Sequence, residues 1–241
     1  MVWKNDLNFY KRTCDLTGNS IISIFPPNAP VDKVYSVKAW WSDDWDALEY
    51  GRDYDPDRSF FDQWQELYTK VPKLALVNDD GIASTGCEYA SNWAFSKNVY
   101  MSNIGWRAEN AYYTVYMNKG RDVVDCLSVF VDANGCYDCV SIENCYECRH
   151  CHHVKNLSNC TFCYDCKGCS DCFMCTGLRN QQYCFKNEQY SKDEYFEILA
   201  SYQLNTHTGT EKARREYDEF ILLHPRRPLY MTQCVNSIGD D

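Results

Sequence analysis

The chain has 241 residues, enough for one large or two small domains with a substantial core. Lysine and arginine number 24 against 34 aspartates and glutamates, which gives a formal net charge of -10. This balance argues against nucleic acid as the main partner, because phosphate backbones are bound by clustered basic side chains. No run of 18 apolar residues occurs, and the N-terminus lacks the apolar core of a secretion signal. We therefore expect a cytoplasmic protein without a membrane partner.

Residues 1–57 are predicted to form a small ribbon-like module of strands and turns. The segment SIISIF has the composition of a strand and is followed by the turn-like PPNAP. Trp40, Trp41 and Trp45 are interpreted as core residues that anchor this module against the next element.

A capping helix is predicted for residues 58–72. Its apolar residues recur at helical spacing: Phe60, Phe61, Trp64, Leu67, Tyr68 and Val71. Ser59 fits the N-cap position, and Pro72 ends the helix. We expect this helix to cover an open end of the domain that follows, because an unpaired strand edge promotes aggregation.

Residues 73–190 contain an internal repeat of twelve residues, with a small or apolar residue at every third position. One of the four columns reads Cys87, Val99, Ala111, Val123, Cys136, Cys148, Cys160, Cys172 and Cys184. The register slips by one residue between Cys126 and Cys136, as a β-bulge or a widened corner would produce. In this alignment Asp132 stands in the column of Ser96 and Ala108.

A spacing of three fits neither a helix, which needs about 3.6, nor a flat strand, which needs alternation. A coil that turns corners and stacks on the next coil at about 4.8 Å does fit. One coil buries nothing by itself, whereas about eight stacked coils form a core. The predicted fold class is therefore mainly β: a narrow β-solenoid with about twelve residues per coil.

The region after the repeat is predicted to be helical. Residues 191–224 should form a helical hairpin that covers the other end, with Ser191 and Glu194 in a capping-box pattern. Residues 225–241 are expected to form a tail or a partial extra coil.

The repeat resembles the solenoid of beetle antifreeze proteins, which also have twelve-residue coils with inward cysteines. Their ice-binding face is a regular Thr-x-Thr array. The corresponding face here begins with Asn98 and Tyr100, then Asn110 and Tyr112, and is irregular and bulky. The resemblance therefore implies the coil geometry and not ice binding.

A second resemblance rests on the segments KRTCDLTGNSIIS, WWSDDWDALEYGRDYD, SFFDQWQEL and NQQYCFKNEQYSKDEYFE. They resemble an uncharacterised cysteine-rich repeat family of uncultured small-genome bacteria, which brings no known activity. Members of that family often carry zinc-ribbon cysteine pairs where this chain has Cys14, Thr17, Ser36 and Ala39. One cysteine cannot hold zinc, so the resemblance implies a ribbon-like fold without the metal.

One coil has cysteine in all four inward columns: Cys160, Cys163, Cys166 and Cys169. Four thiolates at one level are the ligand set of tetrahedral zinc. Cysteine is also small, apolar and often buried, and Ala, Ser, Thr, Val and Gly take the same columns elsewhere. Three interpretations stay open: reduced thiols packed as core, disulfides across coils, or a structural zinc as the sole cofactor.

Outward aromatic residues predict a partner face. Tyr100, Tyr112, Tyr137 and Phe173 each follow the first inward column, so they lie on one side of the coils. Such a strip suits a protein partner. The same residues would also fit a ladder that only stabilises the stack, or a face covered by the terminal helices.

No catalytic residues are predicted. The sequence contains no nucleophile elbow, no phosphate-binding glycine loop and no HExxH motif. The predicted function is a non-enzymatic scaffold or protein-interaction module, within an oligomer or a larger assembly. The alternative is a zinc- or thiolate-binding protein that uses the Cys160–Cys169 coil.

Overall fold

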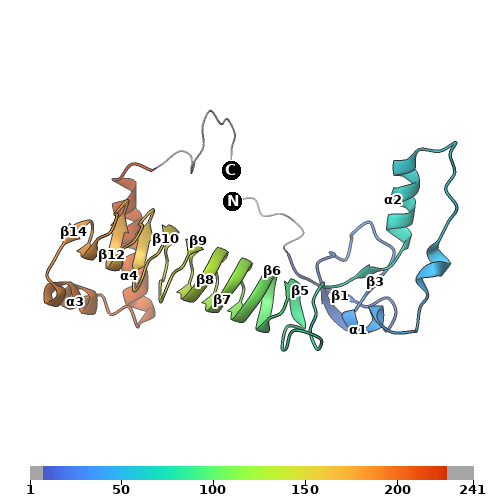
Figure 1. Cartoon of the computed structure of the whole chain (residues 1–241), viewed down its shortest axis with the longest axis horizontal. Coiled ribbons are helices and arrows are strands. Elements are labelled where there is room, and N and C mark those ends of the chain that lie inside the picture. The colour runs from blue at the N-terminus through green and yellow to red at the C-terminus, as the bar shows by residue number, and fades with distance from the viewer. Residues whose placement is uncertain (1–7, 227–241) are drawn as a thin grey trace. The chain divides into compact units, whose positions relative to one another are not determined.

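The computed structural model describes residues 8–226, which divide into two compact units after residue 147 (Figure 1). With 40% of residues in strands and 21% in helices, the fold is mainly β. It has a β-solenoid of about eight turns with coils of about twelve residues, a small N-terminal ribbon and C-terminal helices. The predicted fold class is confirmed.

The N-terminal ribbon combines two short sheets with one helical turn. Its elements are β1 (Tyr10–Thr13), β2 (Ser20–Ser23), β3 (Val34–Tyr35), α1 (Val37–Trp40), a 3-10 turn (Ala47–Tyr50) and β4 (Lys73–Leu74). The strands β1 and β2 pair antiparallel, and β3 pairs parallel with β4. Trp40 and Trp45 pack against a small core that includes Tyr35, as expected of core residues, whereas the core position expected for Trp41 is wrong, since this residue is 73% exposed.

The positions that resemble zinc ligands meet at one turn of this ribbon. The backbone N–H of Ser36 donates to Cys14 Sγ at 3.3 Å, and Ala39 packs in the same core as Cys14. Burial alone would raise the pKa of Cys14, but hydrogen bonds from Thr17 and Ser36 outweigh it and lower the pKa to about 7. Hydrogen bonds and apolar contacts hold this turn together.

The predicted capping helix forms as α2 (Phe60–Lys70), after Ser59 at the N-cap. It contains no buried residue. Its aromatic side chains are open to solvent: Phe60 is 57%, Phe61 76%, Trp64 50% and Tyr68 37% exposed. The helix is therefore observed, while its role as a cap stays a prediction.

The coils of the first unit are parallel strands, each paired with the next in chain order (Figure 1). They are β5 (Tyr89–Ala94), β6 (Lys97–Tyr112), β7 (Val115–Val124), β8 (Leu127–Tyr137) and β9 (Val140–Glu143). Ala111 pairs with Val123, and Val123 pairs with Cys136, so the predicted column is present.

The slip in the repeat is a β-bulge, as expected. Asn118 pairs with Phe130, whereas Gly120 pairs with Ala133, so β8 contains one extra residue. The inward place predicted for Asp132 is wrong. Ala133 takes it with 1% of its surface exposed, while Asp132 lies outside and pairs with Lys119 at 2.6 Å. A charged side chain stays in solvent because the bulge lets its small neighbour fill the core instead.

Left-handed backbone recurs at every third residue of the coils and turns the corners. Asn98, Asn110 and Asp122 have φ of 54°, 56° and 54°, and Asn and Asp tolerate this conformation. Bulky residues adopt it as well, including Ile104 at 62° and Tyr113 at 54°. Each costs about 1–2 kcal/mol, so a single coil is unfavourable and only the stack is stable.

Side-chain hydrogen bonds explain why Ser, Thr and Cys share an inward column. Ser102 Oγ donates to the carbonyl two residues earlier at 3.0 Å, Thr114 Oγ1 does so at 3.1 Å, and Cys126 Sγ at 3.2 Å. Each side chain is small, buried and able to donate to its own coil. Cysteine thus fills the column as an apolar donor.

The second unit combines further coils with two helices (Figure 1). Its elements are β10 (His152–Lys155), β11 (Thr161–Tyr164), β12 (Ser170–Thr176), β13 (Gln182–Phe185), β14 (Glu188–Gln189), α3 (Lys192–Ser201) and α4 (His207–Leu222). The capping box of Ser191 and Glu194 is confirmed. The predicted tail lies, from residue 227 on, outside the described residues. Among the helices between residues 8 and 226, none is long and apolar enough to cross a bilayer.

Candidate functional site

Tyrosine rings line one outer side of the coils in the first unit. Tyr100 contacts Tyr89 edge-to-face with ring centroids 5.9 Å apart, and contacts Tyr113 in the same way at 5.8 Å. Their exposed fractions are 41% for Tyr89, 43% for Tyr100 and 54% for Tyr113, and Tyr137 is 44% exposed. We call these four residues the tyrosine face.

Two of the four residues predicted for the partner face, Tyr100 and Tyr137, belong to the tyrosine face. Tyr100 and Tyr137 are exposed, but Tyr112 is half-buried, and its neighbour Tyr113 makes the ring contact with Tyr100. Tyr113 occupies a left-handed corner, from which its side chain also points outward. The sequence signal that could have identified Tyr113 is its place directly after Tyr112, where a corner residue recurs in every coil.

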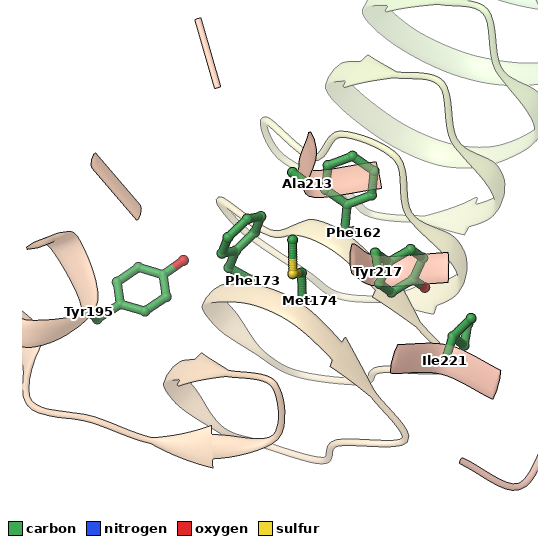
Figure 2. Packing of buried hydrophobic residues seen from close by; sticks show 7 residues of the cluster. All are labelled: Phe162, Phe173, Met174, Tyr195, Ala213, Tyr217 and Ile221. Carbon is green, nitrogen blue, oxygen red and sulfur yellow. The ribbon is translucent and has the colours of Figure 1, made fainter. Parts of the chain in front are cut away.

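Phe173, the fourth residue predicted for the partner face, is fully buried in the second unit. Figure 2 shows it beside Phe162 and Met174 from the coils, with Tyr217 from α4 close by. The ring of Phe162 lies 5.4 Å from Tyr217, and that of Phe173 lies 4.8 Å from Tyr202. Placing Phe173 on an open face is therefore corrected, because residues of the C-terminal helical region occupy that place.

Carboxylates flank the tyrosine face. Glu88 lies beside Tyr89 and, by its charge, raises the pKa of that phenol. Past Tyr113, the same corner column continues with Asp125 and Asp138, and the pKa of Asp125 is raised by burial and then by the charge of Asp138. Carboxylates therefore lie beside Tyr89 and beside Tyr137, and the coil that contains Asp125 separates Tyr113 from Tyr137.

An amide ladder runs along the coils beside the tyrosine face. Asn98 Nδ2 donates to Asn110 Oδ1 at 3.0 Å, and Asn110 Nδ2 donates to Asp122 Oδ1 at 2.7 Å. The ladder ties three successive coils through their corners, beside the column that contains Tyr100. The face is consequently preorganised, which lowers the entropy that a partner must remove on binding.

A groove of about 480 Å³ adjoins the tyrosine face at Tyr89. Its apolar lining comes from the N-terminal ribbon and the start of the coils, and includes Ile22, Val37, Trp41 and Leu76. This volume falls within the range of about 300–1,000 Å³ for sites that hold small molecules or anchoring side chains. A partner that rests on the tyrosines has room to insert one large side chain here.

The four-cysteine coil contains buried thiols that donate to backbone carbonyls. Cys160, Cys163, Cys166 and Cys169 are not joined by disulfides, and each Sγ lies 3.2–3.7 Å from the carbonyl oxygen two residues earlier. Hydrogen bonds with neighbouring sulfurs, foremost that of Cys151, and burial raise the pKa of Cys163. Hydrogen bonds with Cys163 and Cys172 instead lower the pKa of Cys160 to about 6, and those with Cys166 and Cys172 lower the pKa of Cys169. The four thiols are packed as core residues and differ in acidity.

The zinc interpretation gains no support from this arrangement. In residues 8–226, no group of three or more His, Cys, Asp or Glu side chains is arranged to hold a metal ion. The four sulfurs share one coil, as the sequence predicted, but zinc binding itself stays a prediction.

No family model matches the chain, and neither the curated proteins nor the solved structures contain a similar one.

Proposed function

We propose that this chain is a non-enzymatic scaffold that binds a protein partner on its tyrosine face. The observation that carries the proposal is a contrast between equivalent positions of the coil. In the second unit the aromatic residues of this side are covered by the C-terminal helical region, whereas in the first unit four tyrosines stay 41–54% exposed. Exposed aromatic side chains that gather on one side of a domain mark an interaction site.

The chemistry of the face favours a protein. Tyrosine is enriched in the buried centres of protein interfaces, since it adds a large apolar area and a hydroxyl with little loss of side-chain entropy. The ladder from Asn98 to Asp122 holds the strip rigid. Buried thiols such as Cys163 suit a reducing compartment, so we place this activity in the cytoplasm.

A pair of matched double variants tests the proposal. In Tyr100→Ser/Tyr113→Ser the face is lost, while Trp106→Ser/Phe130→Ser removes two aromatic residues that are 46% and 52% exposed on another outer column of the same coils. Tagged proteins are used for affinity capture from a lysate of the source cells, with quantitative mass spectrometry.

We expect at least one protein to bind the unaltered chain and the Trp106/Phe130 control, and to be depleted roughly tenfold by the tyrosine variant. Circular dichroism verifies that both variants remain folded. Capture that is independent of Tyr100 and Tyr113 contradicts the proposal, as does equal depletion by both variants.

A further inference from the structure

The helix α2 presents a second uncovered aromatic surface in the same unit as the tyrosine face. Phe60, Trp64 and Tyr68 follow one another at four-residue spacing, so they share one side of the helix with the adjacent Phe61. Trp64 stacks on Tyr68 with ring centroids 5.1 Å apart, and Phe60 contacts Phe61 at 5.5 Å. A helix with such a stripe normally buries it.

Polar contacts hold α2 in its helical form without covering its aromatic side. The Gln63 side chain accepts from the Asp55 N–H at 2.9 Å and donates to the Asp55 carbonyl at 2.9 Å. Glu66 forms ion pairs with Arg58 and Arg52. The helix is thus preformed, and a partner does not have to fold it on binding.

The second unit shows how this chain covers an aromatic side of its coils. The helix α4 buries Ala213, Tyr217 and Ile221, which recur at four-residue spacing, and the Tyr217 ring meets that of Phe162 (Figure 2). An amphipathic helix with an apolar stripe therefore covers these coils. In the first unit α2 has an aromatic stripe that is largely exposed, and only its Tyr68 ring is partly covered, by the Lys73 ammonium 3.9 Å from the ring centroid.

We propose that α2 of a second copy of the chain lies on the tyrosine face, and that the contact is reciprocal. The result is a two-fold symmetric dimer in which each copy contributes one helix and one face. This inference rests on the proposed function, because it names the partner of the same surface.

The area available matches what a stable dimer needs. Four aromatic side chains on α2 and four on the tyrosine face are each about half exposed. At roughly 200 Å² per aromatic side chain, they present on the order of 800 Å² per copy. A standard protein interface takes about 800 Å² from each partner. The two surfaces together therefore suffice for a specific dimer without further contacts.

Charge and shape are compatible with this arrangement. Asp62 and Glu66 lie on the side of α2 opposite Phe60 and Trp64, because residues advance by about 100° along a helix. The carboxylates beside the tyrosine face are therefore not brought against them. The groove beside Tyr89, about 480 Å³ in volume, accepts one aromatic ring of the incoming helix.

Complementation between two variants tests the dimer. The helix variant Phe61→Ser/Trp64→Ser removes the two central aromatic residues of α2, and the face variant is Tyr100→Ser/Tyr113→Ser. Trp106→Ser/Phe130→Ser is the control. Molar mass is measured by light scattering and analytical ultracentrifugation on the full chain, up to about 100 µM, where a dimer with a dissociation constant of about 10 µM is largely formed.

We expect the unaltered chain and the control to dimerise, and each of the other variants to weaken dimerisation at least tenfold. An equimolar mixture of helix variant and face variant should regain dimer. In that pair the intact face of the first meets the intact α2 of the second, so one of the two contacts is restored. A helix-to-helix or face-to-face dimer gives no such recovery.

The inference is overturned by an unaltered chain that stays monomeric up to about 100 µM, by dimers that survive both double variants, or by a mixture that dimerises no better than its components. These results leave the proposed function standing if capture of another protein still depends on Tyr100 and Tyr113. If capture of a partner does not depend on Tyr100 and Tyr113, and the face variant still dimerises, then both the dimer and the proposed function are rejected.

Discussion

The two units build similar coils but differ in what covers the coils from outside. In the second unit, Phe162 is only 2% exposed and Phe173 is 0% exposed, because residues of the C-terminal helical region pack on them. In the first unit, Tyr100 and Tyr113 occupy the same side of the coil and remain about half exposed. The same side of the repeat is thus part of a core where the C-terminal helices pack on it and stays open to solvent in the first unit.

The interiors of the two units differ as well. In the first, residue sizes are matched between neighbouring coils: a Cβ on Gly105 would lie only 2.2 Å from the Trp93 ring, so glycine there makes room for tryptophan. In the second, cysteines such as Cys163 and Cys175 repeat in the same column and donate to nearby carbonyls. Matched large and small residues fill the narrow coils of the first unit, and cysteines fill those of the second. The outer aromatic residues of the two units therefore differ in burial mainly because helices cover only those of the second unit.

The largest expected effect is the difference in lost stability between substituting a covered aromatic residue and substituting an exposed one. Phe173→Ala leaves a cavity beneath the helical region and should cost about 3–5 kcal/mol. Tyr113→Ala removes a side chain that is 54% exposed and should cost less than about 1 kcal/mol. Hydrogen exchange with mass spectrometry, read separately for β11–β13 and β6–β8, measures both. Equal losses would show that the tyrosine face is part of the core.

A smaller effect concerns the corners that both units share. Ser141 has φ of 54°, and Ser141→Val places a β-branched residue in left-handed backbone at a cost of about 1–2 kcal/mol. Ser170 lies in the strand β12, where Ser170→Val should be neutral within about 0.5 kcal/mol. Urea unfolding of the two variants gives the difference. Equal destabilisation would mean that stacking, and not the corner backbone, limits the choice of residue.

The smallest effect distinguishes the ribbon cysteine from the coil cysteines. Because the pKa of Cys14 is lowered to about 7, the folded state binds fewer protons than the unfolded chain, and its stability falls as pH drops through this value. The stability gap between the unaltered chain and Cys14→Ala should widen by about 1 kcal/mol from pH 7 to pH 8.

Cys184 supplies the control for this titration. Burial raises its pKa, so its contribution is fully present below the pKa of the unfolded thiol and declines only at higher pH. The gap for Cys184→Ala should not widen between pH 7 and pH 8. Urea unfolding under reductant at both pH values provides the measurement, and a parallel response of Cys14→Ala and Cys184→Ala would contradict the assignment.

The sequence by itself determined the coil. An inward residue at every third place implies corners at the same spacing, since only a turning chain keeps such residues on one side, and the columns from Cys87 to Cys184 follow directly. The capping box at Ser191 could also be predicted from the sequence, because it depends only on residues that are close together in the chain. The slip in the repeat predicted a bulge but not which residue would point inward. Asp132 and Ala133 were both possible, and Ala133 points inward because the carboxylate of Asp132 stays in solvent and pairs with Lys119.

Only the tertiary structure decided which side chains are open. Phe173 and Tyr100 have equivalent places in the repeat, and local pattern gives both the same prediction. Their difference arises from the C-terminal helical region, which follows Phe173 in the chain and returns to the coils: Tyr202 contacts the Phe173 ring, and Tyr217 of α4 contacts Phe162. Burial depends on contacts between distant segments, whereas the coil depends on spacing within twelve residues, and for this reason the repeat could be read from the sequence and the partner face could not.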